Sequence, residues 1–284
     1  MQQPTPAFAR PLTRLSQLGE LGLLAELERR GLIVGVEHDA AVVGDLVVTQ
    51  DALVEGVHFR LDRLGWRELG FRAAAVNLSD LAASGAVPLA LLVSFAAPGD
   101  TDAAAAIELY EGIAETGVPV VGGDTTAAPA VMLSVTALGR SDRVPGRAGA
   151  RPGDVLVVTG PLGGAGAAFR EGAYIRPPLR LVEGRRLASV ANAMLDVSDG
   201  LAVDLAHLAK RSSVRCVVDL ERVPLAAGAT VGDLGFGEDF ELLAAVPDAA
   251  GFAEIGRVEA GEGVELLERG SAVELPGYEH YVER

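Results

Sequence analysis

The chain consists of two runs of alternating apolar strands and helices, separated by a passage that suits neither. Residues 139–153 are rich in glycine and proline, which favour turns over regular elements. On both sides of this passage, apolar stretches of strand length alternate with helical stretches. The pattern predicts the α/β (or α+β) class with two consecutive α/β domains, at residues 1–145 and 146–284.

Hydrophobic spacing and turn residues place the individual elements. In the first half we expect strands at 46–54, 89–97, 118–121 and 131–138, and helices at 66–84 and 102–116. In the second half we expect strands at 154–159, 194–197, 214–220 and 240–246, and helices at 179–193 and 198–211, with Ser198 as the cap of the last. The window 81–99 carries no charge, but Gly85 and Pro88 interrupt it. It therefore predicts a helix end and a buried strand, not a membrane span.

The charge balance restricts the classes of ligand. The formal net charge is −15, from 24 basic and 39 acidic side chains, which argues against nucleic acid and anionic membranes as partners. Lys210 is the only lysine, so a phosphate-binding loop of the GxxxxGK[ST] type is absent. If the protein handles a nucleoside triphosphate, metal ions and arginines must neutralise it.

One cysteine and the first residues bear on location. Cys216 is the single cysteine and lies in an apolar stretch, so we expect a core residue and no disulfide within the chain. Residues 1–15 contain prolines and arginines without an apolar core, unlike a signal peptide. We expect a cytoplasmic protein.

Six aspartates stand out because most of them follow or interrupt apolar runs: Asp39, Asp51, Asp80, Asp124, Asp196 and Asp199. Ligand sites of α/β sheets gather where strands end, although a single aspartate there is more often a turn or cap residue. Asp80 is different, because it lies inside a predicted helix in a polar stripe with Asn77 and Ser84. A buried carboxylate needs a partner, and Mg²⁺ prefers such oxygen ligands. We expect several of the six to bind metal.

The segment around Asp196 combines metal-binding and phosphate-binding features. Asp196 and Ser198 lie on the same side of an extended segment, and Asp199 begins a predicted helix whose free amides favour an anion. The four histidines are scattered, and no GxSxG motif or nucleophilic triad is present. The spacing suggests a site for both metal and phosphate.

Seven segments in the same order, from about residue 33 to the end, resemble one family. They are Asp39-Ala-Ala-Val-Val43, Asp51-Ala-Leu-Val-Glu-Gly-Val-His-Phe59, Ala75-Val-Asn-Leu-Ser-Asp-Leu-Ala-Ala83, Gly122-Gly-Asp-Thr-Thr126, Gly146-Arg-Ala-Gly-Ala-Arg-Pro-Gly-Asp154, Asp196-Val-Ser-Asp-Gly-Leu201 and Gly237-Glu-Asp-Phe-Glu-Leu242. The closing segment Gly277-Tyr-Glu-His-Tyr281 adds to the likeness. The chain resembles the thiamine-monophosphate kinases, in the ATP-binding superfamily that includes aminoimidazole ribonucleotide synthetase.

The resemblance implies two α/β domains, a homodimer formed through the N-terminal sheet, and a cleft for ATP and several Mg²⁺ ions. By position, the implied metal ligands are Asp39, Thr49, Asp51, Asp80, Asp124, Asp196 and Asp199. The implied nucleotide-binding residues are Gly123, Asp124, Arg147 and Ser198, and the implied substrate-binding residues are His58, Glu238 and Tyr281. Asp80, Asp124 and Arg147 are the expected catalytic residues.

The implied reaction transfers the γ-phosphoryl group of ATP to the phosphate of thiamine monophosphate, giving thiamine diphosphate. The acceptor phosphate is already ionised at neutral pH, so no strong general base is needed. His38 and Gln50 stand where the family has an aspartate and a threonine. The alternatives are another ATP-dependent member such as aminoimidazole ribonucleotide synthetase, a non-catalytic nucleotide-binding relative, and a structural metal-binding protein.

Overall fold

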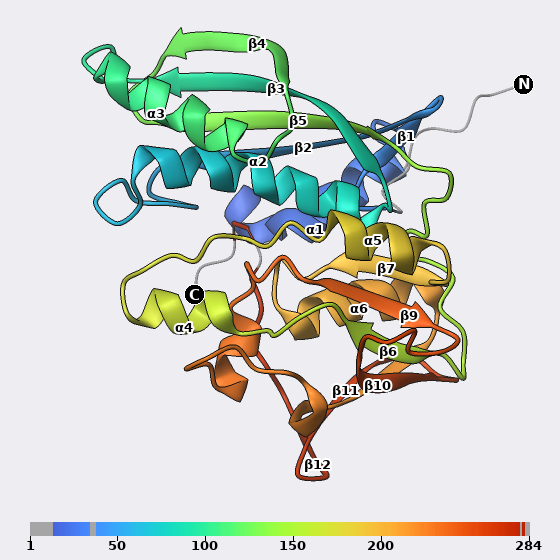
Figure 1. The fold of residues 1–284 in the computed structure, drawn as a ribbon. Coiled ribbons are helices and arrows are strands. Elements are labelled where there is room, and N and C mark those ends of the chain that lie inside the picture. Colours follow the sequence, from blue (N-terminus) through green and yellow to red (C-terminus); the bar gives the residue numbers. More distant parts are fainter. Residues whose placement is uncertain (1–13, 35–37, 279, 282–284) are drawn as a thin grey trace, which may run out of the picture.

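Two β-sheets lie on either side of helix α2, and each sheet has further helices of its own (Figure 1). The computed structural model describes residues 14–34, 38–278 and 280–281. The segment 1–13, on which most of the signal-peptide argument rests, lies outside the described residues. The sheets fall on opposite sides of the glycine-rich passage, because the last strand of the first ends at Arg140 and the second begins at Val155. The mixed α/β class is confirmed.

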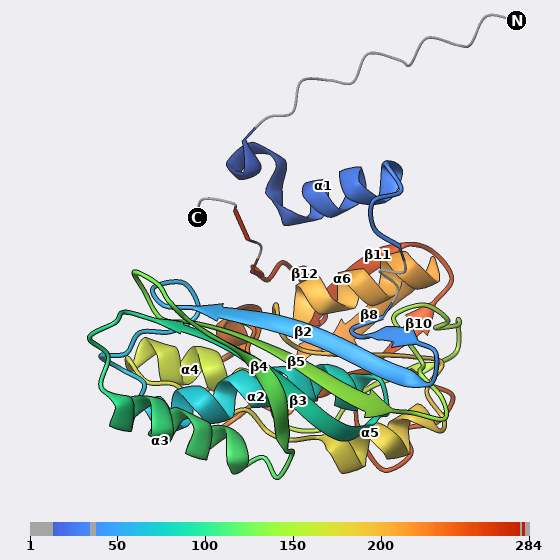
Figure 2. The same ribbon diagram turned by 90° about the horizontal axis from the view of Figure 1, so that it is seen from above.

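The first sheet has five strands in the order β1-β2-β5-β3-β4, and only β3 and β4 pair in parallel. The strands are β1 (Ala41–Val43), β2 (Leu46–Val54), β3 (Val87–Ala97), β4 (Val120–Ala127) and β5 (Met132–Arg140). Helices α2 (Trp66–Ala83) and α3 (Ala103–Ala114) cover one face. Helix α1 (Leu15–Arg29) was not predicted, and Figure 2 shows it standing apart from the sheet near the C-terminal segment.

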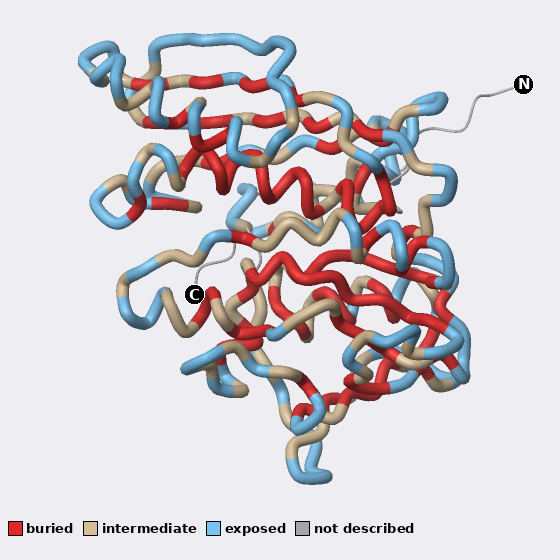
Figure 3. The backbone as a smooth tube through the Cα atoms, in the orientation of Figure 1, coloured by how far each residue is buried: buried red, intermediate tan, exposed pale blue. Residues whose placement is uncertain are grey.

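The other face of this sheet is open. Along β3, residues on the helix side such as Leu91 and Val93 are buried, whereas Leu92 on the open side is 38 % exposed. All eight residues of the edge strand β4 are exposed, as the pale-blue strand in Figure 3 shows. The expectation of a fully buried strand at 89–97 is therefore half wrong, because the sheet is covered by helices on one side only.

The second sheet has seven strands in the order β12-β11-β8-β10-β6-β9-β7, and only β11 and β8 pair in parallel. The strands are β6 (Val155–Val158), β7 (Ala193–Asp196), β8 (Arg215–Asp219), β9 (Leu242–Val246), β10 (Ala253–Glu259), β11 (Gly263–Glu268) and β12 (Ser271–Val273). The accompanying helices are α4 (Gly164–Arg170), α5 (Leu181–Ala188), α6 (Leu201–Ser212) and the 3-10 turns η1 (Leu220–Arg222) and η2 (Val231–Gly235). Helix α6 packs on one face through Leu201, Leu205 and Leu208.

Helix α2 joins the two halves through a shared core. Fourteen of its residues are buried, because the first sheet and α3 cover one side and the second half covers the other. Ala82 and Ala83 at its end pack with Leu187 of α5 and Met194 of β7. The division into domains 1–145 and 146–284 stays a prediction, and the two halves are firmly packed together.

Three predicted boundaries are wrong, each for a local reason. The strand expected at 118–121 is displaced to Val120–Ala127, since Gly122 and Gly123 pair with β3 instead of turning. The helix expected at 179–193 ends at Ala188, after which the chain turns into β7. Helix α6 begins at Leu201 with Gly200 as its N-cap, so Ser198 does not cap it.

Two other expectations are confirmed. Cys216 is fully buried among apolar side chains, and burial raises the pKa of its thiol to about 12. The window 81–99 is indeed the end of α2 followed by β3. Among the helices that the structure describes, none combines the length and the apolar character needed to cross a bilayer.

Candidate active site

A pocket of about 860 Å³ lies between the first sheet, α2 and the loops of the second half. Its walls come from segments far apart in sequence: β2, α2, the β7–α6 loop, the loop before β9 and the C-terminal segment. The predicted residues that line it are Asp39, Thr49, Asp51, His58, Asp80, Arg147, Asp196, Ser198, Asp199, Glu238 and Tyr281. The fold therefore brings together most of the candidates.

Four carboxylates gather at one end of the pocket: Asp39, Asp51, Asp80 and Asp196. The Thr49 hydroxyl donates to the Asp80 carboxylate (2.5 Å), and the Ser79 hydroxyl donates to Asp196 (2.6 Å). These hydroxyls come from β2 and α2, so the packing of the helix on the sheet fixes the carboxylate positions.

Arg147 forms an ion pair with Asp39 in this cluster. Its Nε donates to Oδ1 of Asp39 at 2.7 Å, and its terminal nitrogen lies 2.7 Å from the same oxygen. The second oxygen, Oδ2 of Asp39, is buried and has no hydrogen-bond partner in the described part of the chain. A buried carboxylate oxygen without a donor is costly unless a cation reaches it.

The raised pKa values of these carboxylates show that burying their charges together is unfavourable. Burial raises the pKa of Asp80 well above its usual value, and Asp51 and Asp196 raise it further. Burial and Asp39 raise the pKa of Asp196 to about 8. Burial raises the pKa of Asp39 and Asp51 as well, although Arg147 opposes the shift at Asp39. The site accumulates more negative charge than its own residues neutralise.

The cluster fits a hydrated divalent cation better than a fully protein-ligated one. Within residues 14–34, 38–278 and 280–281, no three His, Cys, Asp or Glu side chains meet closely enough to bind one metal by themselves. Mg²⁺ usually keeps several waters and takes one or two carboxylates plus substrate phosphates. The unpartnered oxygen of Asp39 and the raised carboxylate pKa values suit that role.

The β7–α6 loop gives the pocket a second acidic position. The Asp204 carboxylate, on the first turn of α6, accepts a hydrogen bond from the Asp199 amide at 3.1 Å. Asp204, rather than Ser198, therefore binds a free amide at this helix start. Burial raises the pKa of Asp199 to about 6, and Ser198 remains beside it on the pocket wall.

The opposite end of the pocket is aromatic and carries one acid. Glu238 forms an ion pair with Arg72, whose side chain is only 3 % exposed. The Arg72 guanidinium also lies over the rings of Tyr174, at 5.5 Å, and Phe240, at 5.9 Å. The Arg72 guanidinium therefore contacts one carboxylate and two aromatic rings of this wall.

Histidine and tyrosine rings from the C-terminal segment complete this side. The rings of His58 and His280 are 5.2 Å apart, and Tyr281 packs 6.2 Å from His280. The amide of Val54 donates to Nδ1 of His58 at 3.0 Å, which leaves its proton on Nε2. Burial lowers the pKa of His58, with His280 as the next cause, so the imidazole stays neutral.

Gly123 and Asp124 do not line this pocket. They lie in β4, three strands from β2, and Asp124 is in register with Ser94 of β3. Successive pairs continue from Ser94 to Ser134 and from Ser134 to Ala52. Paired residues share one face of a sheet, so Asp124 lies on the opposite face from Asp51.

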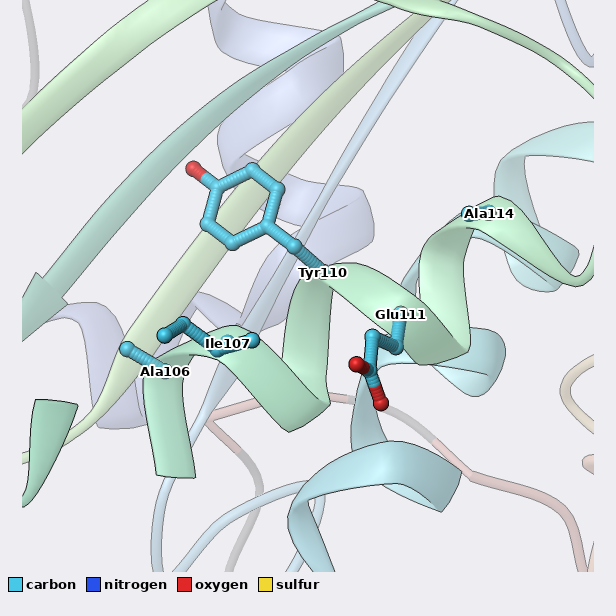
Figure 4. A pocket seen from close by; sticks show the side chains of 5 residues that line it. All are labelled: Ala106, Ile107, Tyr110, Glu111 and Ala114. Carbon is cyan, nitrogen blue, oxygen red and sulfur yellow. The ribbon is translucent and has the colours of Figure 1, made fainter. Parts of the chain in front are cut away.

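Two other features of the structure lie apart from the carboxylates. A shallower pocket of about 450 Å³ is formed by α3, where Tyr110 extends toward the strands (Figure 4). The Tyr110 side chain forms a hydrogen bond with Thr125 of β4. The glycine-rich turn at 160–166 resembles a phosphate-binding loop, but its amides at Gly163 and Ala165 bind the Asp239 carboxylate, at 2.6 and 3.1 Å. These two amides of the turn are therefore bound to Asp239 and are not available for a phosphate.

Comparisons with known proteins relate this geometry to a family. Residues 37–141 match the family described as AIR synthase related protein, N-terminal domain. The chain is 38 % identical to a thiamine-monophosphate kinase of Mycobacterium tuberculosis over 87 % of each sequence. It is 35 % identical to that of Pyrococcus horikoshii, covering 83 % of this chain and 86 % of the relative. The chain belongs to the thiamine-monophosphate kinase family.

Solved structures support the same assignment. The crystal structure of the Aquifex aeolicus thiamine monophosphate kinase has a TM-score of 0.83 at 33 % identity, covering 92 % of this chain and all of that one. A complex described as "AaThiL complexed with AMPPCP and TMP" has a TM-score of 0.86 at 31 % identity, with 95 % of this chain and 100 % of the other covered. Structures of the hydrogenase maturation protein HypE, near 20 % identity, share the fold alone.

Sequence reasoning missed several residues that line the pocket, among them Glu20, Tyr174, Phe236 and His280. It also missed Arg72, which is buried behind Glu238. Arg72 was detectable in principle, because it is an arginine inside an apolar helix and lies eight positions before Asp80. Glu20 had no local signal. It reaches the pocket only because α1 lies near it.

Proposed function

We propose that this protein catalyses ATP- and Mg²⁺-dependent phosphorylation of thiamine monophosphate to thiamine diphosphate. The observation that carries the proposal is one pocket with two chemically different ends: clustered carboxylates at one, and aromatic rings with Glu238 at the other. A phosphorylated heterocycle needs both ends, because its phosphate requires the metal-binding carboxylates and its ring requires the aromatic wall. The relatives named as thiamine-monophosphate kinases, and the fold shared with a complex of AMPPCP (an ATP analogue) and TMP, support it.

In the proposed reaction, an oxygen of the acceptor phosphate forms a bond to the γ-phosphorus of ATP. The bond from that phosphorus to the β–γ bridging oxygen breaks, and ADP leaves. No pocket residue has to remove a proton, because the acceptor is ionised at neutral pH. Arg147 neutralises phosphate charge, Ser198 contacts the nucleotide, and His58, Glu238 and Tyr281 orient the thiamine rings.

Several hydrated Mg²⁺ ions would be held among Asp39, Thr49, Asp51, Asp80, Asp196 and Asp199. Asp124 from β4 of a second copy of the chain would be a further ligand. Bound there, the ions would offset the charge that develops between the two substrates. The protein's own contribution is to hold these oxygens in position through Ser79 and through Asn77, whose side chain accepts from the Asp51 amide at 2.9 Å. Without the cations, the carboxylates repel one another and the phosphates.

We also propose a homodimer formed through the open face of the first sheet. That face and the adjoining β4 expose Val121 (64 %), Met132 (39 %) and Leu92 (38 %), which is unusual for the surface of a monomer. Pairing of two such faces would cover Gly123 and Asp124 and bring them toward the partner's nucleotide site. The single buried cysteine agrees with a cytoplasmic location.

The test is ADP release with ATP and Mg²⁺ in the presence of thiamine monophosphate or free thiamine. We expect turnover with the monophosphate and none with thiamine, which lacks the ionised acceptor. Asp80→Asn should lower kcat by about 100-fold or more, since it weakens metal and phosphate positioning together. Turnover left intact by Asp80→Asn would refute the role of the cluster. ATP binding without any acceptor-dependent ADP release would point to a non-catalytic relative.

A further inference from the structure

Arg72 is a buried residue next to the pocket to which the proposed reaction gives no role. It lies in α2 with a side chain only 3 % exposed. Its Nε and one terminal nitrogen are buried without a hydrogen-bond partner among the described residues, although that terminal nitrogen is in close ionic contact with Glu238. Arginine is rarely buried unless it is paired, because the cost of desolvation is large.

The position of Arg72 on α2 assigns it to one end of the pocket. Arg72, Val76 and Asp80 are spaced four residues apart, so they lie along one face of the helix. Val76 and Asp80 line the pocket. At 1.5 Å per residue, Arg72 is about 12 Å along the axis from Asp80, so it lies toward the other end of the pocket.

What Arg72 does contact is the wall opposite the carboxylates. Its guanidinium pairs with Glu238 and lies over Tyr174 and Phe240, three residues that all line the pocket. Glu238 and Phe240 have left-handed backbones, with φ of 60° and 51°. Such conformations in residues other than glycine persist only when surrounding contacts fix them. Arg72 is the group that touches both side chains.

We propose that Arg72 is a positioning residue for the heterocycle end of the substrate. It holds the Glu238 carboxylate and the two aromatic rings so that Glu238 can accept hydrogen bonds from a flat, amino-substituted ring. The Glu238 side chain is 28 % exposed and reaches the pocket, whereas Arg72 stays behind it. This inference rests on the proposed function, because it concerns the thiamine monophosphate site and leaves the ATP site unchanged.

The experiment compares the KM for thiamine monophosphate, the KM for ATP and kcat in Arg72→Met, Arg72→Lys and Glu238→Gln. Arg72→Met should raise the KM for thiamine monophosphate roughly 10-fold or more, as expected when an oriented charged hydrogen bond is lost, with the KM for ATP within about twofold. Arg72→Lys should recover part of the loss, because it restores the charge without the planar stacking. Combining Arg72→Met with Glu238→Gln should add little to either change alone.

Arg180→Met is the matched control. Arg180 pairs with the buried Glu241 at 2.5 Å, three residues beyond Glu238, but does not line the pocket. It should lower the thermal unfolding temperature without changing the KM for thiamine monophosphate. If Arg72→Met does not fold, the KM for thiamine monophosphate and the KM for ATP are compared in Arg72→Lys and Glu238→Gln instead.

Two results would overturn the inference. One is an unchanged KM for thiamine monophosphate in the Arg72 variants, and the other is an equal rise in the KM for ATP. Wild-type turnover of thiamine monophosphate is measured first, since its absence would refute the proposed function itself and not the role of Arg72.

Discussion

At the scale of single residues, four carboxylates that are distant in sequence meet in one pocket: Asp39, Asp51, Asp80 and Asp196. Each lies in or next to an element whose type the sequence indicates. Asp80 lies inside an apolar helix, where a carboxylate requires a special environment. The hydroxyl of Ser79 and the guanidinium of Arg72 act through tertiary contacts, which local spacing does not encode.

His207 gives a prediction about pH. Burial, together with Arg147 and Lys210, lowers the pKa of His207 to about 4, from 6.5 when solvated. Between these values the unfolded chain binds more protons than the folded one, so protonation of His207 favours unfolding as pH falls from about 6.5 to about 4. His207→Gln should reduce this acid-dependent loss of stability, as measured by urea unfolding at pH 7 and pH 5. An identical pH dependence in wild type and variant would contradict it.

At the scale of elements, the strongly apolar helices and strands were predicted well and the glycine-containing ones poorly. Helix α2 was expected at 66–84 and is found at Trp66–Ala83. Strand β4 contains Gly122 and Gly123, which suggest a turn in isolation, yet pairing with β3 extends them. Helix α6 begins at Leu201, three residues after Ser198, because Gly200 adopts a φ of 107°. Tertiary pairing and one glycine conformation decide these boundaries.

The contact of α2 with α3 gives a prediction about stability. A Cβ on Gly70 would lie 1.8 Å from the carbonyl oxygen of Leu109, so any side chain there must separate the helices. Gly70→Ala should lower the free energy of unfolding by about 2 kcal/mol or more, as overpacking does in cores. Gly99→Ala is the control, because no atom lies within 4 Å of the Cβ it adds. Equal chemical-denaturation midpoints for the two variants would be evidence against the close contact.

At the scale of the whole molecule, one predicted site residue, Asp124, lies outside the pocket. Asp124 lies on the open face of the first sheet and does not meet Asp51 or Asp80. The family resemblance assigned Asp124 to the same site as Asp51 and Asp80. The order of motifs along a chain does not show which face of a sheet a residue occupies, so the separation could not be predicted. Strand β4 is exposed. In the homodimer that we propose, Asp124 would lie near the site of the partner.

A mixed dimer tests that arrangement. Asp80→Asn and Asp124→Asn should each inactivate a homodimer, whereas a purified heterodimer of the two variants should regain about half of wild-type activity, because one of its two sites is intact. If each site used Asp80 and Asp124 of the same chain, the heterodimer would be inactive. Leu92→Arg should give monomers in light scattering, and Val182→Arg, at a position 59 % exposed on α5, should not.

The central claim is that this chain transfers a phosphoryl group from ATP to a phosphate, and phosphorus NMR of the reaction tests it most directly. With ATP, Mg²⁺ and thiamine monophosphate, the monoester resonance and the γ-phosphate resonance of ATP should disappear together. The two diphosphate resonances of thiamine diphosphate should grow at the same rate, beside those of ADP. Inorganic phosphate appearing while the monoester resonance stays constant would show ATP hydrolysis only, and would contradict the account.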